Sequence, residues 1–194
     1  PFRDLWMSTA HGMTSGTSPP PFEYYRASEV LSISGHRVKN NAELTRNLGI
    51  MPIVPDIGLD ALDVRPGGET VFSSTEAVFS ESLGETLGPG DILSDRGRLL
   101  MRHTALVAPF SPMPPVADLG LDALQDLGRA GYAFSVATGF FSEKLGRQIG
   151  RGDLLLSDGT VLKSIKELLA RFQPVDDGGP PVGDPGLDAV YLWP

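Results

Sequence analysis

Hydrophobic and polar positions alternate in short runs along most of the chain, and turns rich in glycine and proline separate the runs. The apolar positions of residues 59–64 and 70–74 flank the turn "RPGG", and this arrangement predicts a β-hairpin. A second hairpin is predicted at 153–163, where Asp158-Gly159 interrupts an apolar run, because Asp-Gly is a strong signal for a tight turn. The pattern therefore predicts a chain built mainly from short antiparallel strands.

Apolar residues with helical spacing follow some of these hairpins. In residues 164–172 the spacing predicts a short helix with Ser164 as its N-cap and Glu167 three residues later, the arrangement of a capping box. Residues 40–49 show the same pattern, with a glycine as the stop. A third, weaker helix is expected at 102–110, where Pro109 interrupts it.

One apolar-acidic phrase occurs three times. "GLDAL" begins at Gly58 and at Gly120, and "GLDAV" begins at Gly186. When the chain is shifted by 62 residues, 71–93 lies over 133–155 without a gap. Such self-similarity predicts a repeat architecture. We expect a single domain, 1–194, made of three repeats: 1–57, 58–119 and 120–185, with 186–194 completing the first.

Each repeat contains four short strands in two hairpins and one short helix. Four antiparallel strands per repeat are typical of a β-propeller blade. We expect an all-β fold with short helices, propeller-like and pseudo-threefold, closed by pairing of the C-terminal strand with the N-terminal repeat. Because propellers typically have about 4–8 blades, a compact β-trefoil-like closure stays open as the alternative.

The predicted core consists of apolar positions that mostly recur between repeats. They are Leu59, Leu62, Phe72, Leu93, Leu121, Phe134, Leu155, Leu168 and Phe172.

The phrase "GLDALDVRPGGETVFSS" at 58–74 resembles the first hairpin of blades in NHL-repeat and gluconolactonase-like propellers. The resemblance covers about one hairpin per repeat. The phrases GLDAL, FS and GD(I/L)L also resemble those of bacterial repeat proteins of unknown function. The first resemblance implies a propeller, and for the gluconolactonase-like family a divalent cation held by several acids and an Asn. No Asn of this chain matches that pattern.

Composition narrows the function classes. The chain has 194 residues and a formal net charge of -8, and an acidic surface repels phosphate backbones, so nucleic acid is not an expected partner. It has no cysteine, which excludes disulfides and thiolate chemistry. No apolar run is long enough for membrane insertion. The first residue is Pro1, without an initiator Met, so we expect a processed or trimmed form. We expect a secreted or periplasmic protein, with a cytoplasmic location left open.

The recurring acids of the repeated phrase are candidate metal ligands. Asp60, Asp122 and Asp188 occupy one position of the three phrases, and three carboxylates around an axis would suit Ca²⁺. The alternative reading is structural: an Asp beside a recurring Gly commonly accepts hydrogen bonds from its own turn. We favour the structural reading and expect no cofactor, with Ca²⁺ as the alternative.

Residues that depart from the repeat pattern are the other candidates. The segment 8–25, "STAHGMTSGTSPPPFEYY", is the least repeat-like, and it contains His11, Tyr24 and Tyr25, which we take as candidate ligand-binding residues. It has no nucleophile elbow and no acid at informative spacing. The sequence therefore predicts a non-enzymatic binding or structural module, with a possible homodimer or larger assembly as its partner state. The alternative is a metal-dependent lactonase or esterase of the propeller type.

Overall fold

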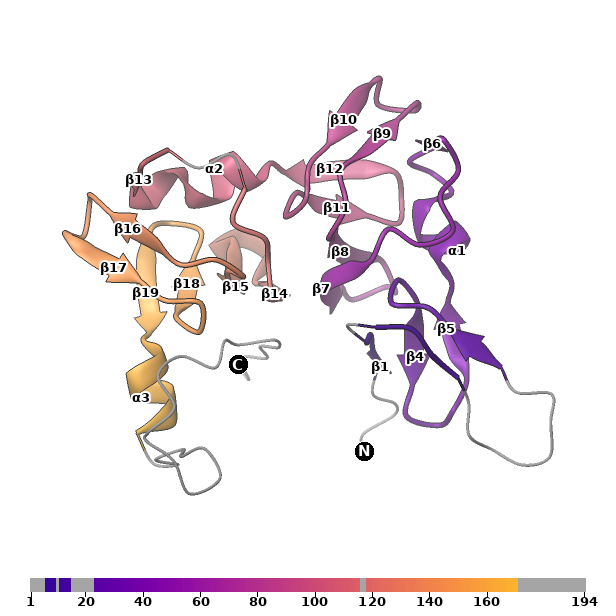
Figure 1. Ribbon diagram of the computed structural model, residues 1–194, viewed down its shortest axis with the longest axis horizontal. Helices are drawn as coiled ribbons and strands as arrows, with labels where there is room; N and C mark the ends of the chain where they lie inside the picture. The colour runs from indigo at the N-terminus through magenta and orange to yellow at the C-terminus, as the bar shows by residue number, and fades with distance from the viewer. Residues whose placement is uncertain (1–5, 10, 15–22, 116–117, 171–194) are drawn as a thin grey trace. The chain divides into compact units, whose positions relative to one another are not determined.

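The computed structural model describes residues 6–9, 11–14, 23–115 and 118–170. By its contacts the chain divides into two compact units, 1–100 and 101–194, each built from short antiparallel strands (Figure 1). The first unit contains β1 (Trp6–Met7), β2 (Met13–Thr14), β3 (Tyr24–Tyr25), β4 (Val30–Ser32), β5 (Arg37–Lys39), α1 (Asn41–Thr45), β6 (Ile50–Met51), β7 (Leu59–Val64), β8 (Thr70–Ser74), β9 (Val78–Ser80), β10 (Glu85–Leu87), β11 (Ile92–Ser94) and β12 (Arg98–Met101), which ends at the boundary. The second unit contains α2 (His103–Val107), η1 (Ala108–Phe110), β13 (Pro112–Met113), β14 (Ala123–Asp126), η2 (Gly128–Ala130), β15 (Tyr132–Ser135), β16 (Phe140–Ser142), β17 (Arg147–Ile149), β18 (Leu154–Leu156), β19 (Thr160–Lys163) and α3 (Ile165–Leu169).

Strands dominate the regular structure of the described residues, and the three α-helices are short. The prediction of a mainly β fold with short helices is therefore confirmed. In the first unit the sheets have the orders β12-β11-β8-β7, β1-β4-β5, β10-β9-β6 and β2-β3. In the second unit they have the orders β14-β15-β18-β19 and β13-β16-β17. None of these six sheets of described residues closes on itself.

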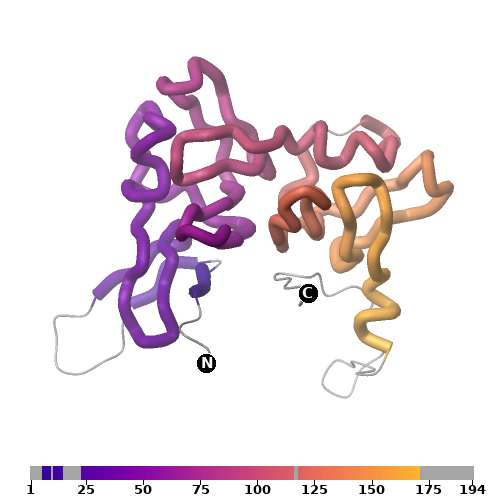
Figure 2. Tube along the Cα trace, turned by 180° about the vertical axis from the view of Figure 1, so that it is seen from behind, coloured from indigo at the N-terminus to yellow at the C-terminus, as the bar shows by residue number. Residues whose placement is uncertain are grey.

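The two four-stranded sheets have the same strand order and corresponding register. In the first unit Phe72 of β8 lies opposite Leu93 of β11. In the second unit Phe134 of β15 lies opposite Leu155 of β18, and both residues stand 62 positions later. Between the second and third strands of each sheet the chain leaves to form an outer hairpin, β9–β10 or β16–β17, and the Cα trace shows this excursion in each unit (Figure 2).

Each of these two outer hairpins gains a third strand from the segment that precedes its four-stranded sheet. β6 pairs with β9, with Met51 opposite Phe79. β13 pairs with β16, with Met113 opposite Phe141. A hydroxyl inside the hairpin fixes each junction: Ser80 Oγ donates to the Leu48 carbonyl oxygen, and Ser142 Oγ donates to that of Phe110.

The local sequence explains where the elements begin and end. Gly67 and Gly68 take positive φ in the turn between β7 and β8. The Asp158 side chain accepts from the backbone N–H of Thr160 at 2.8 Å in the turn between β18 and β19. Both predicted hairpins are therefore confirmed. Capping boxes open α1 and α3, and α2 passes at its end into the 3₁₀ turn that contains Pro109.

The predicted core positions lie mainly inside. Leu62 and Leu168 are only half-buried, and Phe172 lies outside the described residues. In the second unit the Phe110 ring meets those of Phe134 and Phe140 edge to face, with centroids 6.3 and 6.0 Å apart. The remaining predicted core side chains are almost fully buried: Leu59, Phe72, Leu93, Leu121, Phe134 and Leu155.

Ser111 is strained in a turn where its counterpart is glycine. Gly49 and Ser111 follow α1 and η1, and both have left-handed φ angles, 61° and 50°. The Gly49 carbonyl accepts from the backbone N–H of Glu81 at 2.9 Å, and the Ser111 carbonyl accepts from that of Glu143 at 3.0 Å. Both donors belong to the outer hairpins. Among the described residues Ser111 alone has positive φ without being glycine.

Replacing Ser111 with glycine should raise the free energy of unfolding by up to about 1 kcal/mol, because relief of left-handed strain exceeds the entropy that glycine loses. The reverse change, Gly49→Ser, should lower it by about 1–2 kcal/mol, since a Cβ there would lie 2.7 Å from Ser82 Oγ. Urea unfolding of both variants measures the effect. A destabilised Ser111→Gly would contradict this account.

His103 and Asn41 perform the same task at the start of their helices. His103 is buried, and its Nε2 accepts from the backbone N–H of Leu119 at 3.0 Å. The Asn41 side-chain oxygen accepts from the N–H of Ile57 at 3.4 Å. Asn41 and Ile57 stand 62 residues before His103 and Leu119, so the two hydrogen bonds correspond. Because each N–H is buried, it needs this acceptor.

Substituting His103 with Asn should therefore keep the fold, whereas His103→Leu should lower the free energy of unfolding by about 1–3 kcal/mol, the cost of a buried N–H without an acceptor. Chemical denaturation of the two variants side by side measures the difference. Equal stability of the Asn and Leu variants would show that the acceptor does not matter.

Candidate functional site

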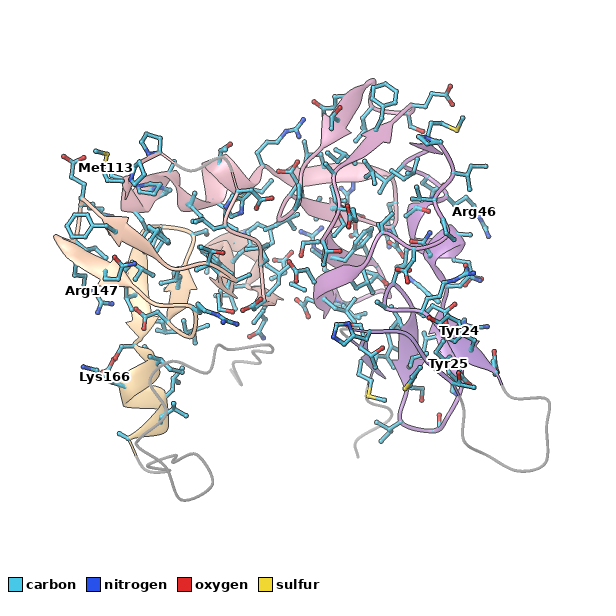
Figure 3. The ribbon with its side chains drawn as sticks, viewed as in Figure 1. Tyr24, Tyr25, Arg46, Met113, Arg147 and Lys166 are labelled. Atoms are coloured by element: carbon cyan, nitrogen blue, oxygen red, sulfur yellow. The ribbon has the colours of Figure 1, made fainter. Side chains whose placement is uncertain are left out.

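The two predicted tyrosines lie on a small hairpin of the first unit. Strands β2 and β3 pair with Met13 opposite Tyr25 and Thr14 opposite Tyr24. The Tyr24 side chain, labelled in Figure 3, is 57% exposed. A Cβ added at Gly12 would lie 2.0 Å from the Tyr24 hydroxyl oxygen. Gly12 therefore makes room for the ring, which presents an aromatic surface to solvent.

Arg37 of β5 anchors this hairpin to the neighbouring sheet. Its guanidinium forms ion pairs with Glu23 at 2.9 Å and with Glu29 at 2.8 Å, and donates to the Tyr24 carbonyl oxygen at 3.2 Å. The guanidinium carbon also lies 5.2 Å from the centre of the Tyr25 ring, a cation–π contact. Sequence reasoning missed Arg37, because nothing local marks it as a partner of residues 8 to 14 positions away.

The electrostatics of this cluster keep its tyrosine protonated and its arginine charged. Partial desolvation and the hydrogen bond to Glu23 raise the pKa of the Tyr25 hydroxyl, so the phenol stays protonated. The hydrogen bond that Arg37 donates to Glu29 outweighs desolvation and raises the pKa of Arg37 further above its ordinary value. The cluster thus holds Tyr25 and Arg37 in fixed charge states and leaves Tyr24 as its exposed face.

His11 precedes this hairpin and is exposed. Its carbonyl oxygen accepts the Thr9 hydroxyl at 2.8 Å. No carboxylate or hydroxyl of the described residues contacts its imidazole ring, so these residues form no nucleophile and base pair around His11.

Two of the predicted metal ligands lie in different compact units of the chain. Asp60 is half-buried on β7 in the first unit, and Asp122 is half-buried just before β14 in the second. Asp188 lies outside the described residues. Across 6–9, 11–14, 23–115 and 118–170, no three His, Asp or Glu side chains are grouped so as to hold a metal ion.

The acids two residues before the repeated phrase accept hydrogen bonds from backbone N–H groups. The Asp56 carboxylate accepts three N–H groups, those of Ala27, Ser28 and Gly58, at 3.1, 3.0 and 3.0 Å. The Asp118 carboxylate accepts from the Gly120 N–H at 2.8 Å. At these two positions the carboxylates have a structural role.

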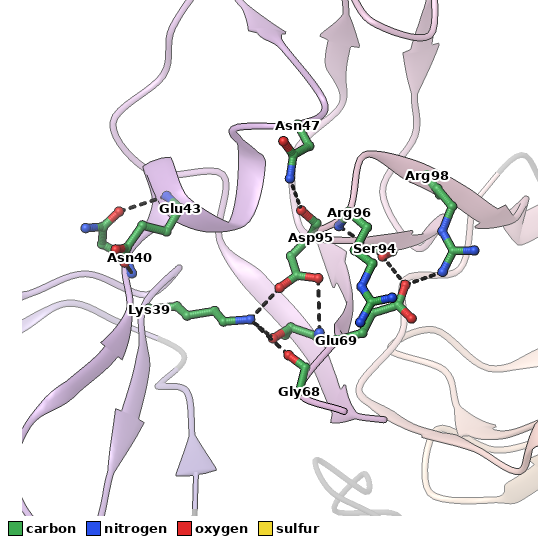
Figure 4. A network of polar contacts seen from close by, with 11 residues as sticks. Lys39, Asn40, Glu43, Asn47, Gly68, Glu69, Ser94, Asp95, Arg96 and Arg98 are labelled. Carbon is green, nitrogen blue, oxygen red and sulfur yellow. Dashed lines mark hydrogen bonds and ion pairs between the residues drawn. The ribbon is translucent and has the colours of Figure 1, made fainter. Parts of the chain in front are cut away.

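A second polar network joins β5 to the four-stranded sheet of the first unit (Figure 4). Lys39 pairs with Asp95 and also donates to the Thr70 hydroxyl at 2.7 Å. Asp95 in turn accepts from the Thr70 N–H at 3.2 Å, and its own carbonyl accepts from the Asn47 side chain at 2.7 Å. The ion pair thereby connects Lys39 and Asp95, which are 56 positions apart in the sequence.

Glu69 is the acid of this region with the largest shift in pKa. Its side chain is buried beside Ser94, Arg98 and Arg65. Desolvation opposes ionisation, but the hydrogen bonds from Ser94 and the two arginines outweigh it and lower the pKa from 4.5 to about 2. The ionised form is therefore the form that the fold stabilises.

Stability should depend on pH through Glu69. Because its pKa is lower in the folded protein, the contribution is present above pH 4.5 and is lost as the pH falls towards about 2. We expect Glu69→Gln to lower the melting temperature at pH 7 and the difference from the unchanged protein to shrink below pH 4.5. Thermal unfolding from pH 7 to pH 2.5 measures this, with Glu76→Gln, at an exposed position, as the control. A difference that is constant with pH would contradict the assignment.

Exposed apolar pairs recur on the outer hairpins, and sequence reasoning did not predict them. Met51 and Phe79 lie opposite each other in the first unit and are 44% and 43% exposed. Met113 and Phe141 do the same in the second unit, at 48% and 42%. The sequence signal for these pairs was that Met51 and Phe79 recur 62 residues later as Met113 and Phe141. The alternation of apolar and polar residues on β9 conceals the exposure of Phe79, because Ser80 is buried and the phenylalanine faces solvent.

Comparison with known proteins finds no family model that matches the sequence, no similar protein of curated function and no similar solved structure. Of the helices in the described part of the chain, none has the length and apolar character needed to cross a membrane. Inference about function therefore rests on the arrangement of the described residues.

Proposed function

We propose that the protein is a non-enzymatic β-repeat module for binding or assembly, made of three repeats of about 62 residues in a propeller-like, pseudo-threefold arrangement, with a trefoil-like closure as the alternative. The matching strand orders and registers of the two four-stranded sheets support the repeats. So do the matching junctions at Ser80 and Ser142.

The observation that carries the function is the contrast between acids and apolar side chains. The buried carboxylates of Glu29, Glu69, Asp91 and Asp153 are engaged by backbone N–H groups or by arginines, so they serve the fold. The exposed large apolar side chains that recur 62 residues apart are methionine, phenylalanine and leucine: Met51 and Met113, Phe79 and Phe141, Leu83 and Leu145. Exposed apolar groups that recur on a rigid scaffold are typical of an interaction surface.

The closure of the repeats is supported by the first sheet. The sheet β1-β4-β5 has three strands, whereas the corresponding sheets β12-β11-β8-β7 and β14-β15-β18-β19 have four. Met7 lies opposite Leu31 as Phe72 lies opposite Leu93. Met7 is 41% exposed, although Phe72 and its later counterpart Phe134 are fully buried. We propose that residues 186–194, whose sequence matches that of β7, supply the missing strand beside β1.

Light scattering combined with chelation tests the function. A concentrated solution should contain a species of about 41 kDa, twice the mass of the 20.7 kDa chain. The double variant Phe79→Ser, Phe141→Ser should shift it to the monomer with little change in melting temperature, because both side chains are exposed. Leu162→Ser, at 37% exposure on β19, is the matched control and should keep the dimer.

The same samples distinguish the module from a metal-dependent hydrolase. We expect the mass and the melting temperature to be equal in Ca²⁺ and in EDTA. A monomer at all concentrations would contradict self-assembly. A Ca²⁺-dependent melting temperature together with an esterase activity that EDTA abolishes would contradict the non-enzymatic proposal.

A further inference from the structure

Two turns of the first unit meet at one end of its four-stranded sheet. The turn between β7 and β8 contains Arg65 and Glu69. The turn between β11 and β12 contains Arg96, and Arg98 is the first residue of β12. Because β8 and β11 pair as antiparallel neighbours, the start of β8 and the end of β11 lie at the same end of the sheet. Figure 4 shows Arg96 and Arg98 pointing toward the Glu69 carboxylate from this turn.

The arginines at this end of the sheet have more donors than the protein uses. Glu69 accepts from Arg65 at 3.3 Å and also from Arg98, although one guanidinium would balance its charge. Arg98 contacts Glu69 through Nη2 alone and is 52% exposed. Arg96 is exposed, and within 6–9, 11–14, 23–115 and 118–170 its guanidinium has no hydrogen-bond or ion-pair partner. Donors of two neighbouring arginines therefore remain for a ligand.

The second unit builds the same turns without these charges. The residues 62 positions after Arg65, Glu69, Arg96 and Arg98 are Leu127, Gly131, Asp158 and Thr160. The sheet β14-β15-β18-β19 nevertheless has the same strand order and register. Ser157 Oγ accepts the Tyr132 N–H at 3.0 Å there, as Asp95 accepts that of Thr70 in the first unit. The architecture therefore does not require the arginines, which are specific to the first unit.

The turn that carries Arg96 is held rigidly from both sides. The Asn47 side chain donates to the Asp95 carbonyl oxygen at 2.7 Å, and the Asp95 carboxylate is paired with Lys39. Gly97 packs so closely on α1 that an added Cβ would lie 2.4 Å from the Asn47 carbonyl oxygen. A site on such a fixed turn loses less conformational entropy when a ligand binds.

We propose that Arg96 and Arg98 bind the phosphate group of a small ligand. A phosphate group has three terminal oxygens and can accept from two guanidinium groups at once, whereas the two oxygens of a carboxylate are satisfied by a single fork. A long polyanion would be repelled by the rest of a chain whose net charge is -8, so the site suits one phosphate group, free or esterified. It uses no residue of the proposed assembly surface, so the two proposals can fail separately.

Isothermal titration calorimetry with inorganic phosphate and with phenyl phosphate, at pH 7 and constant ionic strength, tests the site. The double variant Arg96→Gln, Arg98→Gln should weaken binding at least about tenfold. The matched control, Arg129→Gln, Arg151→Gln, removes two exposed arginines of the second unit and should bind like the unchanged protein. Because Arg98 also pairs with Glu69, the single variant Arg96→Gln guards against a folding effect, and it should weaken binding by about fivefold or more.

Tighter binding of phenyl phosphate would identify an ester as the ligand and tighter binding of inorganic phosphate the free anion, and either result supports the site. No binding of either anion by the unchanged protein would overturn it. So would equal affinity of Arg96→Gln and the unchanged protein. Displacement of phosphate by an equal concentration of acetate would also overturn it, since a single fork would then suffice. None of these results would alter the self-association measured by light scattering, and Phe79→Ser, Phe141→Ser should bind phosphate as before.

Discussion

A buried carboxylate holds the turn that returns the chain from an outer hairpin to the inner sheet. Glu29, Asp91 and Asp153 precede β4, β11 and β18, and each is almost fully buried. Each accepts the backbone N–H of the residue three positions earlier, at 3.2, 2.9 and 3.3 Å. Buried N–H groups require acceptors, and a charged acceptor makes the stronger bond. Without this interaction the excursion of the outer hairpin could not end in register with the inner strand.

The same carboxylates connect the turn to its surroundings. Asp153 also accepts the N–H of Ile165, the first residue of α3, at 2.9 Å, so one side chain joins a turn, a strand and a helix. Glu29 pairs with Arg37, and Asp153 pairs with Arg147 at 3.3 Å. In the first unit this link extends to the tyrosine hairpin, because Arg37 also contacts Tyr25. The buried acids Glu29 and Asp153 therefore connect separate elements of the fold.

The features that could be predicted from the sequence are those with local causes. The Asp158-Gly159 turn, the Ser164 capping box and the burial of Phe72 and Phe134 follow from residues within a few positions of one another or from the apolar alternation. The partners of Lys39 and Arg37 depend on how separate hairpins pack, and nothing in the local sequence indicates them. The position of Phe79 was hidden for a related reason: Ser80 takes the inward position because its hydroxyl must donate to the Leu48 carbonyl, and the strand's alternation then places the phenylalanine outside.

The candidate site follows from the same constraint. An isolated two-stranded hairpin is marginal in water, so an outer hairpin gains stability from a third strand or from other contacts that cover it. The hairpin of Tyr24 and Tyr25 has, among the described residues, no such strand and relies on Arg37 and its two carboxylate partners. Tyr24 is exposed and Tyr25 is half-buried, whereas Leu87 and Ile149, at the positions that correspond to Tyr25, are buried. Within the described residues, the incomplete covering of this hairpin is thus the reason that it presents aromatic surface to solvent.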